Sequence, residues 1–169
     1  MKAYKKIGYE LCTGIKGEKL ETNAIFDIDT YSEIWWKDLE NASQEIVISS
    51  PKLNSLKVDL LISALENSME RGLKTTIVTW HPSVYSYGRD DARMALLERL
   101  RKSGFEIRLV EETCERYTVI DRETVWYGSV NYLSKEDIDE IQVIDDEIIV
   151  CYYLGKEKTE FFDCQIVGS

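Results

Sequence analysis

The sequence predicts an α/β fold with a mixed, mostly parallel β-sheet flanked by helices. Short β-branched runs alternate with longer stretches in which apolar residues recur at helical spacing, and this alternation is typical of βαβ crossovers. The 169 residues correspond to roughly one domain, and a hydrophobic content of 44% is enough to bury a core. We therefore expect residues 1–169 to form a single domain.

The first half of the chain predicts two helices, each leading into a strand. Thr30 and Glu33 form a capping box ahead of an amphipathic helix, and the buried strand that follows this helix stops at Pro51. A second helix has its apolar residues within Leu56–Met69, and Gly72 stands where a C-terminal cap belongs.

The second half changes from crossovers to a hairpin. A tight polar turn at Asp121, Arg122 and Glu123 separates two short β-forming runs. The preceding helix begins with acidic residues, ends with basic ones and stops at Gly104, as the helix dipole favours. In chain order, we expect a strand over 73–80, a loop over 81–89, a helix over 90–102, and strands over 105–110, 116–120 and 124–127.

The two ends of the chain have less regular patterns. The carboxylate-rich segment 135–147 predicts a solvated insert. The other expected elements are a short strand or hairpin over 7–15, a strand over 147–153 and a closing helix over 156–165.

Charge and cysteine content narrow the function classes. The formal net charge of −10 disfavours bulk attraction to nucleic acid or anionic lipid, so an anion would need a local pocket. The four cysteines lie far apart, which describes neither a zinc site nor a dense disulfide scaffold. Because no apolar run reaches the about 18–20 residues that cross a bilayer, we expect a cytoplasmic protein with reduced thiols and no membrane partner.

The chemistry-bearing segment reads C-x-R-x4-D-x6-G-S-x-N. Its lettered positions are Cys114, Arg116, Asp121, Gly128, Ser129 and Asn131. Residues two apart on a strand face the same way, so Cys114 and Arg116 are expected to project into one pocket. The hairpin brings the small-residue turn alongside them, where backbone N–H groups and the Asn131 amide can approach a tetrahedral anion. The spacing predicts a phosphate-sized site that holds one cation.

This spacing resembles the H-x-K-x4-D-x6-G-[SG]-x-N signature of the phospholipase D superfamily. Cys114 stands at the histidine position and Arg116 at the lysine position, and the resemblance extends from about Tyr31 to the C-terminus. It implies a phospholipase D-like fold and, in active relatives, covalent catalysis without a metal or other cofactor. One histidine attacks phosphorus, a second protonates the leaving oxygen, and lysine and asparagine hold the non-bridging oxygens. Because each chain carries one motif, the resemblance also implies a symmetric homodimer.

The cysteine at position 114 separates two functions. Without the histidine, we expect a non-catalytic domain that acts as a phosphate- or nucleic-acid-related binding module or as a dimerisation module. Similar domains occur beside bacterial helicase and ATPase modules, which are therefore implied partners. The alternative is a metal-independent phosphodiesterase or nuclease that uses Cys114 in a dimer. Cysteine phosphatases place an arginine six residues after the cysteine, but Ile120 stands there in this chain.

A second alternative rests on Phe26-Asp27-Ile28-Asp29-Thr30. An apolar segment that ends in D-x-D is similar to the motif of haloacid dehalogenase-like phosphatases, in which Asp27 would be the nucleophile and magnesium would bind beside it. Asp29 and Thr30 are equally explained as the cap of the following helix.

Single residues of the motif also have structural explanations. Arg116 could clamp a phosphate with two N–H groups or form an ion pair with Glu115 or Asp121. Asp121 is expected to form the turn and cap its own loop, and His81 to be a solvent-accessible loop residue. A locally positive stretch, expected to be a solvated helix face, contains Arg89, Arg93, Arg99, Arg101, Lys102 and Arg108.

Overall fold

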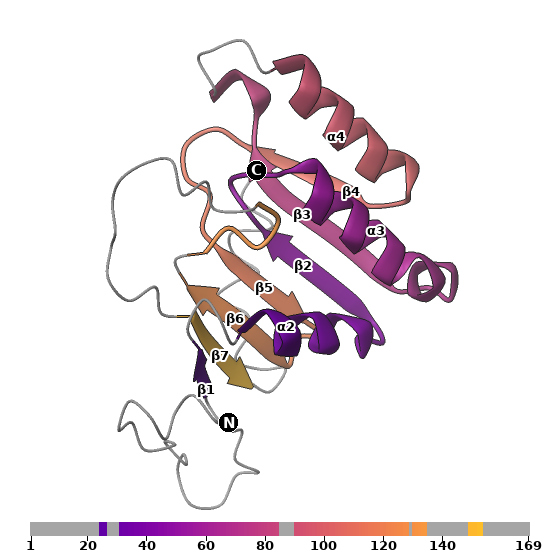
Figure 1. The fold of residues 1–169 in the computed structure, drawn as a ribbon, viewed down its shortest axis with the longest axis vertical. Helices are drawn as coiled ribbons and strands as arrows, with labels where there is room; N and C mark the ends of the chain where they lie inside the picture. Colours follow the sequence, from indigo (N-terminus) through magenta and orange to yellow (C-terminus); the bar gives the residue numbers. More distant parts are fainter. Residues whose placement is uncertain (1–23, 27–30, 85–89, 129, 135–148, 154–169) are drawn as a thin grey trace, which may run out of the picture.

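The computed structural model describes residues 24–26, 31–84, 90–128, 130–134 and 149–153. Its strands are β1 (Ala24–Phe26), β2 (Glu45–Ser49), β3 (Lys74–Trp80), β4 (Glu106–Val110), β5 (Tyr117–Ile120), β6 (Thr124–Gly128) and β7 (Ile149–Tyr153). Its helices are α2 (Tyr31–Glu40), α3 (Ser55–Glu70), α4 (Asp90–Lys102) and the short 3-10 helix η1 (Pro82–Val84). The strands form one sheet in the order β1-β7-β6-β5-β2-β3-β4 (Figure 1).

The sheet has a parallel half and an antiparallel half that meet at β2. Strands β2, β3 and β4 run parallel, joined through α3 and α4. Strand β5 pairs antiparallel with the other side of β2, and β6, β7 and β1 continue that pattern. The predicted α/β class and mixed sheet are confirmed, but the expectation of a mostly parallel sheet is wrong. Parallel pairing is confined to the three crossover-linked strands because the later strands follow a hairpin. Strand β2 is therefore the point where the strand order reverses: β3 and β4, the next strands in the chain, lie on one side of it, and β5 lies on the other.

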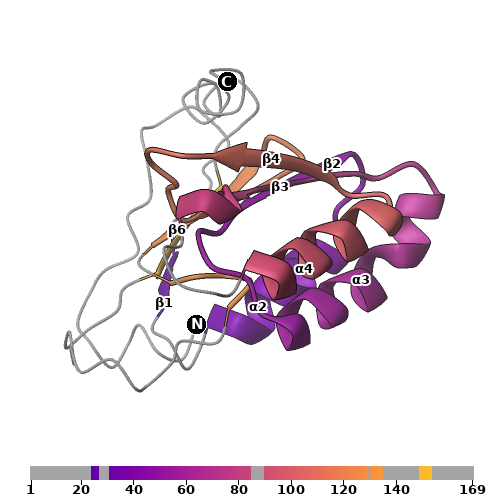
Figure 2. The same ribbon diagram turned by 90° about the horizontal axis from the view of Figure 1, so that it is seen from above.

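Helices α2, α3 and α4 lie on the same face of the sheet (Figure 2). A large apolar cluster fills the space beneath them, with Trp35 of α2, Leu61 of α3 and Trp126 of β6 almost completely buried. Helix α3 begins where the Asn54 side chain accepts a hydrogen bond from the Lys57 N–H, 2.8 Å away. It ends before Gly72, whose φ of +105° is the left-handed conformation that glycine adopts without strain.

A second, smaller apolar cluster occupies the opposite face of the sheet. It consists of Val47, Val78, Tyr117, Val119 and Val125, all at most 7% exposed. Alternate residues of β2 and β5 therefore face two different clusters, because successive side chains of a strand point to opposite faces of the sheet and both faces are covered here. The strands that hold the motif residues are fixed from both faces.

Some predicted elements fall outside the described residues. These are the segments 7–15, 135–147 and 156–165, together with Thr30. Strand β5 begins at Tyr117, one residue later than predicted. None of the helices that the structure describes has the length and apolar character needed to traverse a bilayer.

Candidate functional site

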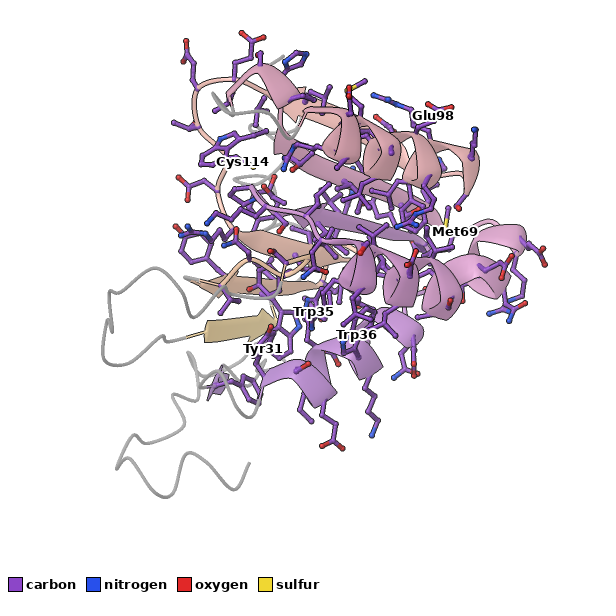
Figure 3. The ribbon with its side chains drawn as sticks, turned by 45° about the horizontal axis from the view of Figure 1, so that its top comes forward. Tyr31, Trp35, Trp36, Met69, Glu98 and Cys114 are labelled. Carbon is purple, nitrogen blue, oxygen red and sulfur yellow. The ribbon has the colours of Figure 1, made fainter. Side chains whose placement is uncertain are left out.

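The candidate site lies where the carboxyl ends of β2 and β3 meet the chain that enters β5. The Cys114 sulfur is 3.6 Å from the Ser49 hydroxyl at the end of β2 and 3.9 Å from the Val78 carbonyl oxygen of β3. Figure 3 shows Cys114 at this end of the sheet. In open α/β sheets, ligands bind outside the carboxyl ends of the strands, where the strand order reverses.

The Cys114 thiol is held in its neutral form. Burial raises the pKa of this thiol above its usual range. The contact with Ser49 and the positive charges of Arg93 and Arg116 act in the opposite direction but do not outweigh burial. Because the nucleophile of cysteine chemistry is the thiolate, a raised pKa makes Cys114 less reactive near neutral pH.

Arg116 is half-buried, and part of its guanidinium has no protein partner. Its Nε atom is buried without a hydrogen-bond partner, and no ion pair joins it to Glu115 or Asp121 within the described ranges. Glu115 instead accepts a hydrogen bond from the Tyr127 hydroxyl, at 3.3 Å. The positive charge of Arg116 acts to lower the pKa of the Cys114 thiol, two residues away in the chain.

The hairpin brings the second half of the motif to the same end of the sheet. The Gly128 N–H donates to the Arg116 carbonyl oxygen at 3.3 Å, and Asn131 follows three residues later. Asn131 is 8% exposed, and its Oδ1 atom has no hydrogen-bond partner. A half-turn of the amide exchanges its oxygen and its N–H donors, so this position can present either. Ser129 lies outside the described residues.

Residues 130–134 are anchored to the loop that follows β2. The Leu133 N–H donates to the Ser50 hydroxyl at 3.2 Å, and the Asn54 N–H donates to the Leu133 carbonyl oxygen at 2.8 Å. The Tyr132 ring stacks on Trp35, with ring centroids 5.4 Å apart. These contacts anchor the segment that contains Asn131 to the carboxyl end of β2.

Arg93 is a second cation at this site, so the prediction that it lies on a solvated helix face is wrong. Its Nη2 atom donates to the Pro51 carbonyl oxygen at 2.9 Å, to the Thr79 hydroxyl at 2.9 Å and to the Trp80 carbonyl oxygen at 3.1 Å. The guanidinium therefore reaches from α4 across the ends of β2 and β3. Helical spacing is the sequence signal that could have indicated this inward position, because Arg93 precedes the buried Leu97 by four residues.

Other cations of that positive stretch are paired with carboxylates. Arg99 contacts Asp59 at 3.0 Å, Lys102 contacts Glu98 at 3.7 Å and Arg108 contacts Glu106 at 2.8 Å. These pairs are exposed or partly exposed, as expected for a solvated surface.

Asp121 lies at the opposite end of the hairpin from Cys114 and Arg116. Asp121 and Arg122 lie in the three-residue loop between the paired residues Ile120 and Thr124, and their φ values of +52° and +56° are in the left-handed region. The Asp121 carboxylate accepts hydrogen bonds from the N–H groups of Ser43, Gln44 and Glu45 at 2.7–2.9 Å, and from the Ser43 hydroxyl at 3.0 Å. The prediction that it caps its own loop is wrong, since it caps the chain that enters β2.

These hydrogen bonds determine the ionisation of Asp121. Burial opposes the charged form, but the N–H groups of Glu45, Ser43 and Gln44 and the Ser43 hydroxyl outweigh it, so the carboxyl pKa is lowered. These contacts of the carboxylate hold the hairpin to the start of β2, at the end of the hairpin away from Cys114.

The remaining candidates are His81 and Asp27. His81 is a loop residue whose Nδ1 lies 2.7 Å from the Ser83 hydroxyl and accepts from the Ser83 N–H at 3.2 Å. Asp27 lies outside the described residues. Within the described part of the chain, no group of three histidine, cysteine, aspartate or glutamate residues could hold a metal ion.

Solved structures share this architecture. Nuc from Salmonella typhimurium, a phospholipase D family member, aligns over 86% of this chain and 91% of its own with a TM-score of 0.59 and 17% identity. NucT from Helicobacter pylori aligns over 88% and 97%, with a TM-score of 0.61 and 15% identity. TrmBL2, an archaeal chromatin protein that binds DNA, aligns over 97% of this chain and 55% of its own, with a TM-score of 0.55 and 16% identity. At these identities, the matches show a shared fold.

Sequence comparison gives the family. No curated protein shows significant similarity to the chain. A family model described as "Cardiolipin synthase, PLD-like domain" matches residues 36–154, which include both halves of the hairpin motif. This match spans more than half of the sequence, and the chain therefore belongs to the family of phospholipase D-like domains.

Proposed function

We propose that this chain is a non-catalytic phospholipase D-like domain that binds a phosphate group of a nucleic acid. The observation that carries the proposal is the Arg116 Nε atom, which is buried without a partner beside a neutral thiol. Asn131, also buried and incompletely bonded, would form the other side of the phosphate site. Gly128 and Ser129 would form the small-residue turn that lets an anion approach the backbone closely.

A phosphate oxygen would satisfy Arg116. A buried N–H group without a partner costs about 1–3 kcal/mol, and more when the group is charged. Native structures rarely keep such a group unless a ligand or water completes it. Guanidinium groups bind phosphate oxygens through parallel N–H bonds, which suits Arg116 at the position where the family signature has lysine.

The same site argues against catalysis. The family reaction needs an imidazole to attack phosphorus, and the sulfur of Cys114 stands in its place. Burial keeps this thiol protonated near neutral pH, so it is a poor nucleophile. A thiol is also a poor acid for protonating the leaving oxygen. These features support a site that holds an anion but lacks the group for cleaving it.

Partners follow from the same proposal. TrmBL2, which shares the fold, binds DNA, and this supports nucleic acid as the source of the phosphate. A homodimer would place two copies of the site together, as one-motif relatives do. Helicase or ATPase modules remain proposed partners on the strength of the family resemblance.

Anion binding is tested by isothermal titration with inorganic phosphate and with a short single-stranded DNA. Arg116→Ala should weaken binding by about 10-fold or more, the value of a charged hydrogen bond. The matched control is Arg122→Ala, which removes an arginine paired with Glu45 at the other end of the hairpin. If Arg122→Ala weakens binding as much as Arg116→Ala does, the assigned site is wrong.

Absence of catalysis is tested with bis-p-nitrophenyl phosphate and single-stranded DNA in the presence of EDTA. We expect no turnover. Turnover that disappears in Cys114→Ser would instead establish the metal-independent phosphodiesterase. Turnover that requires magnesium and is lost in Asp27→Asn would establish the dehalogenase-like phosphatase. The double variant Cys114→His with Arg116→Lys restores the family signature, and hydrolysis by this variant would show that the phosphate site is still in place.

A further inference from the structure

An exposed aromatic side chain lies directly beside the proposed phosphate site. Tyr127 is 41% exposed, and it is the aromatic member of the large exposed apolar residues in the part of the chain that the structure describes. The others are aliphatic residues on the helices: Leu56 and Leu60 of α3, Val84 of η1 and Met94 of α4. A tyrosine at such a position combines an apolar ring with a polar end.

The position of Tyr127 is fixed by the hairpin. It precedes Gly128, whose N–H donates to the Arg116 carbonyl oxygen at 3.3 Å. It pairs across the strands with Tyr117, the residue that follows Arg116. Neighbouring residues on a strand are about 3.3 Å apart, so the backbone of Tyr127 lies close to that of Arg116.

The hydroxyl of Tyr127 reaches a side chain of the motif segment. It donates to Oε2 of Glu115 at 3.3 Å, and Glu115 stands between Cys114 and Arg116 in the chain. An aromatic ring that is oriented by its polar end while its body stays exposed can offer a face to a ligand.

Stacking on such a ring is the sequence-tolerant way in which proteins hold single strands. Every base has a π-face, and aromatic side chains next to a cationic site bind successive nucleotides in this way. The bases of a duplex are already stacked on one another, so a single strand is required. We propose that Tyr127 stacks on the base of a single-stranded nucleic acid whose phosphate is held at Arg116. This inference rests on the proposed function and names its ligand class.

The surface favours this ligand over a phospholipid. A lipid headgroup has no π-face, and its acyl chains need a continuous aliphatic surface. The exposed aliphatic residues lie on α3, η1 and α4 rather than on β6 beside Tyr127. The Glu115 carboxylate would also repel an anionic membrane, whereas a single strand can direct its other phosphates away from it.

The experiment compares two fluorescein-labelled octamers by fluorescence anisotropy at low salt. One is oligothymidine, and the other has the same phosphates with abasic residues in place of the bases. The full chain should bind oligothymidine about 5- to 100-fold more tightly, which is the range expected from stacking one base. Tyr127→Ala and Tyr127→Leu should remove this preference and leave abasic binding unchanged. Tyr127→Phe should keep the preference, and Met94→Ala is the matched control for an exposed apolar residue.

The outcomes separate this inference from the proposed function. Equal binding of the two octamers by the unmodified chain would overturn the role of Tyr127, even if Arg116→Ala weakened both. An Arg116→Ala variant that bound both octamers normally would instead overturn the phosphate site itself. Binding to phosphatidylglycerol vesicles without binding to either octamer would overturn the choice of nucleic acid. Glu115→Gln, which removes a charge but keeps an acceptor for Tyr127, should tighten binding of both octamers.

Discussion

The two ends of the β5–β6 hairpin use the same kinds of residue for opposite purposes. At the turn, the Asp121 carboxylate accepts four hydrogen bonds from Ser43, Gln44 and Glu45, and Arg122 pairs with Glu45. At the open end, Arg116 and Asn131 bury polar atoms that have no partner. One end is therefore complete without a ligand, and the other is not.

This difference explains how one motif can keep its spacing while its chemistry changes. Asp121 fixes the register of the hairpin against β2. This role needs the carboxylate of the signature but not the histidine, whose position Cys114 occupies in this chain. Arg116, Gly128 and Asn131 depend on that register for their placement. The aspartate of the signature can therefore be understood as a structural residue whose effect reaches the site through the strands that connect the two ends.

The largest effect on stability is expected at the turn of the β5–β6 hairpin. Asp121→Ala removes the acceptor for four hydrogen bonds and leaves three backbone N–H groups near the surface without it. We expect the free energy of unfolding to fall by about 2–3 kcal/mol, measured by urea denaturation. Asp121→Asn keeps one oxygen acceptor and should cost less. A loss below about 0.5 kcal/mol in Asp121→Ala would contradict the structural role assigned to the carboxylate.

The contribution of Asp121 should also depend on pH. Its pKa in the folded chain lies below that of an unfolded aspartate, about 3.9. The unfolded chain thus binds the proton first, and the stabilisation is fully present above about pH 5 and is lost as the pH falls through the folded pKa. Urea titrations of the unmodified chain and Asp121→Asn should differ above pH 5 and converge towards pH 3. A constant difference over this range would show that ionisation is not involved.

The sequence predicted the order of the elements because that order follows from local patterns. Helical spacing, β-branched runs and the glycines Gly72 and Gly104, both at positive φ, each act within a few residues. The partner of Asp121 could not be predicted in this way. Ser43 is 78 residues away in sequence, and its contact depends on the pairing of β5 with β2.

The site residues were predictable only where the motif names them. In the sequence, nothing distinguishes Arg93 from the other charged residues of α4. Its inward position depends on how α4 packs over β2 and β3. The exposure of Tyr127 likewise depends on what covers β6. The alternation of side chains along a strand shows which residues share a face, but not whether that face is covered. Residues that act through long-range packing carry too little local pattern to be found from one sequence.

The open end should tolerate the loss of its cation with little effect on folding. Arg116→Ala removes a half-buried guanidinium with an unpartnered Nε, so its loss should change the free energy of unfolding by less than about 0.5 kcal/mol or even increase it. The same variant should lose phosphate binding. Calorimetric unfolding with and without phosphate checks both statements, because ligand that binds the folded chain raises Tm. A destabilisation comparable to that of Asp121→Ala would remove the contrast between the two ends.

The smallest effect concerns the thiol, and it appears only at alkaline pH. Burial raises the folded pKa of Cys114 above the unfolded value of about 8.5. Any stabilisation by the neutral thiol is therefore present below that value and is lost as the pH rises through the folded pKa. Cys114→Ala lacks this dependence, so the difference in unfolding free energy between it and the unmodified chain should shrink from pH 8 to pH 10. Should the difference grow instead, the thiol would be ionised in the folded chain, and the open end would contain a reactive nucleophile beside its two guanidinium groups.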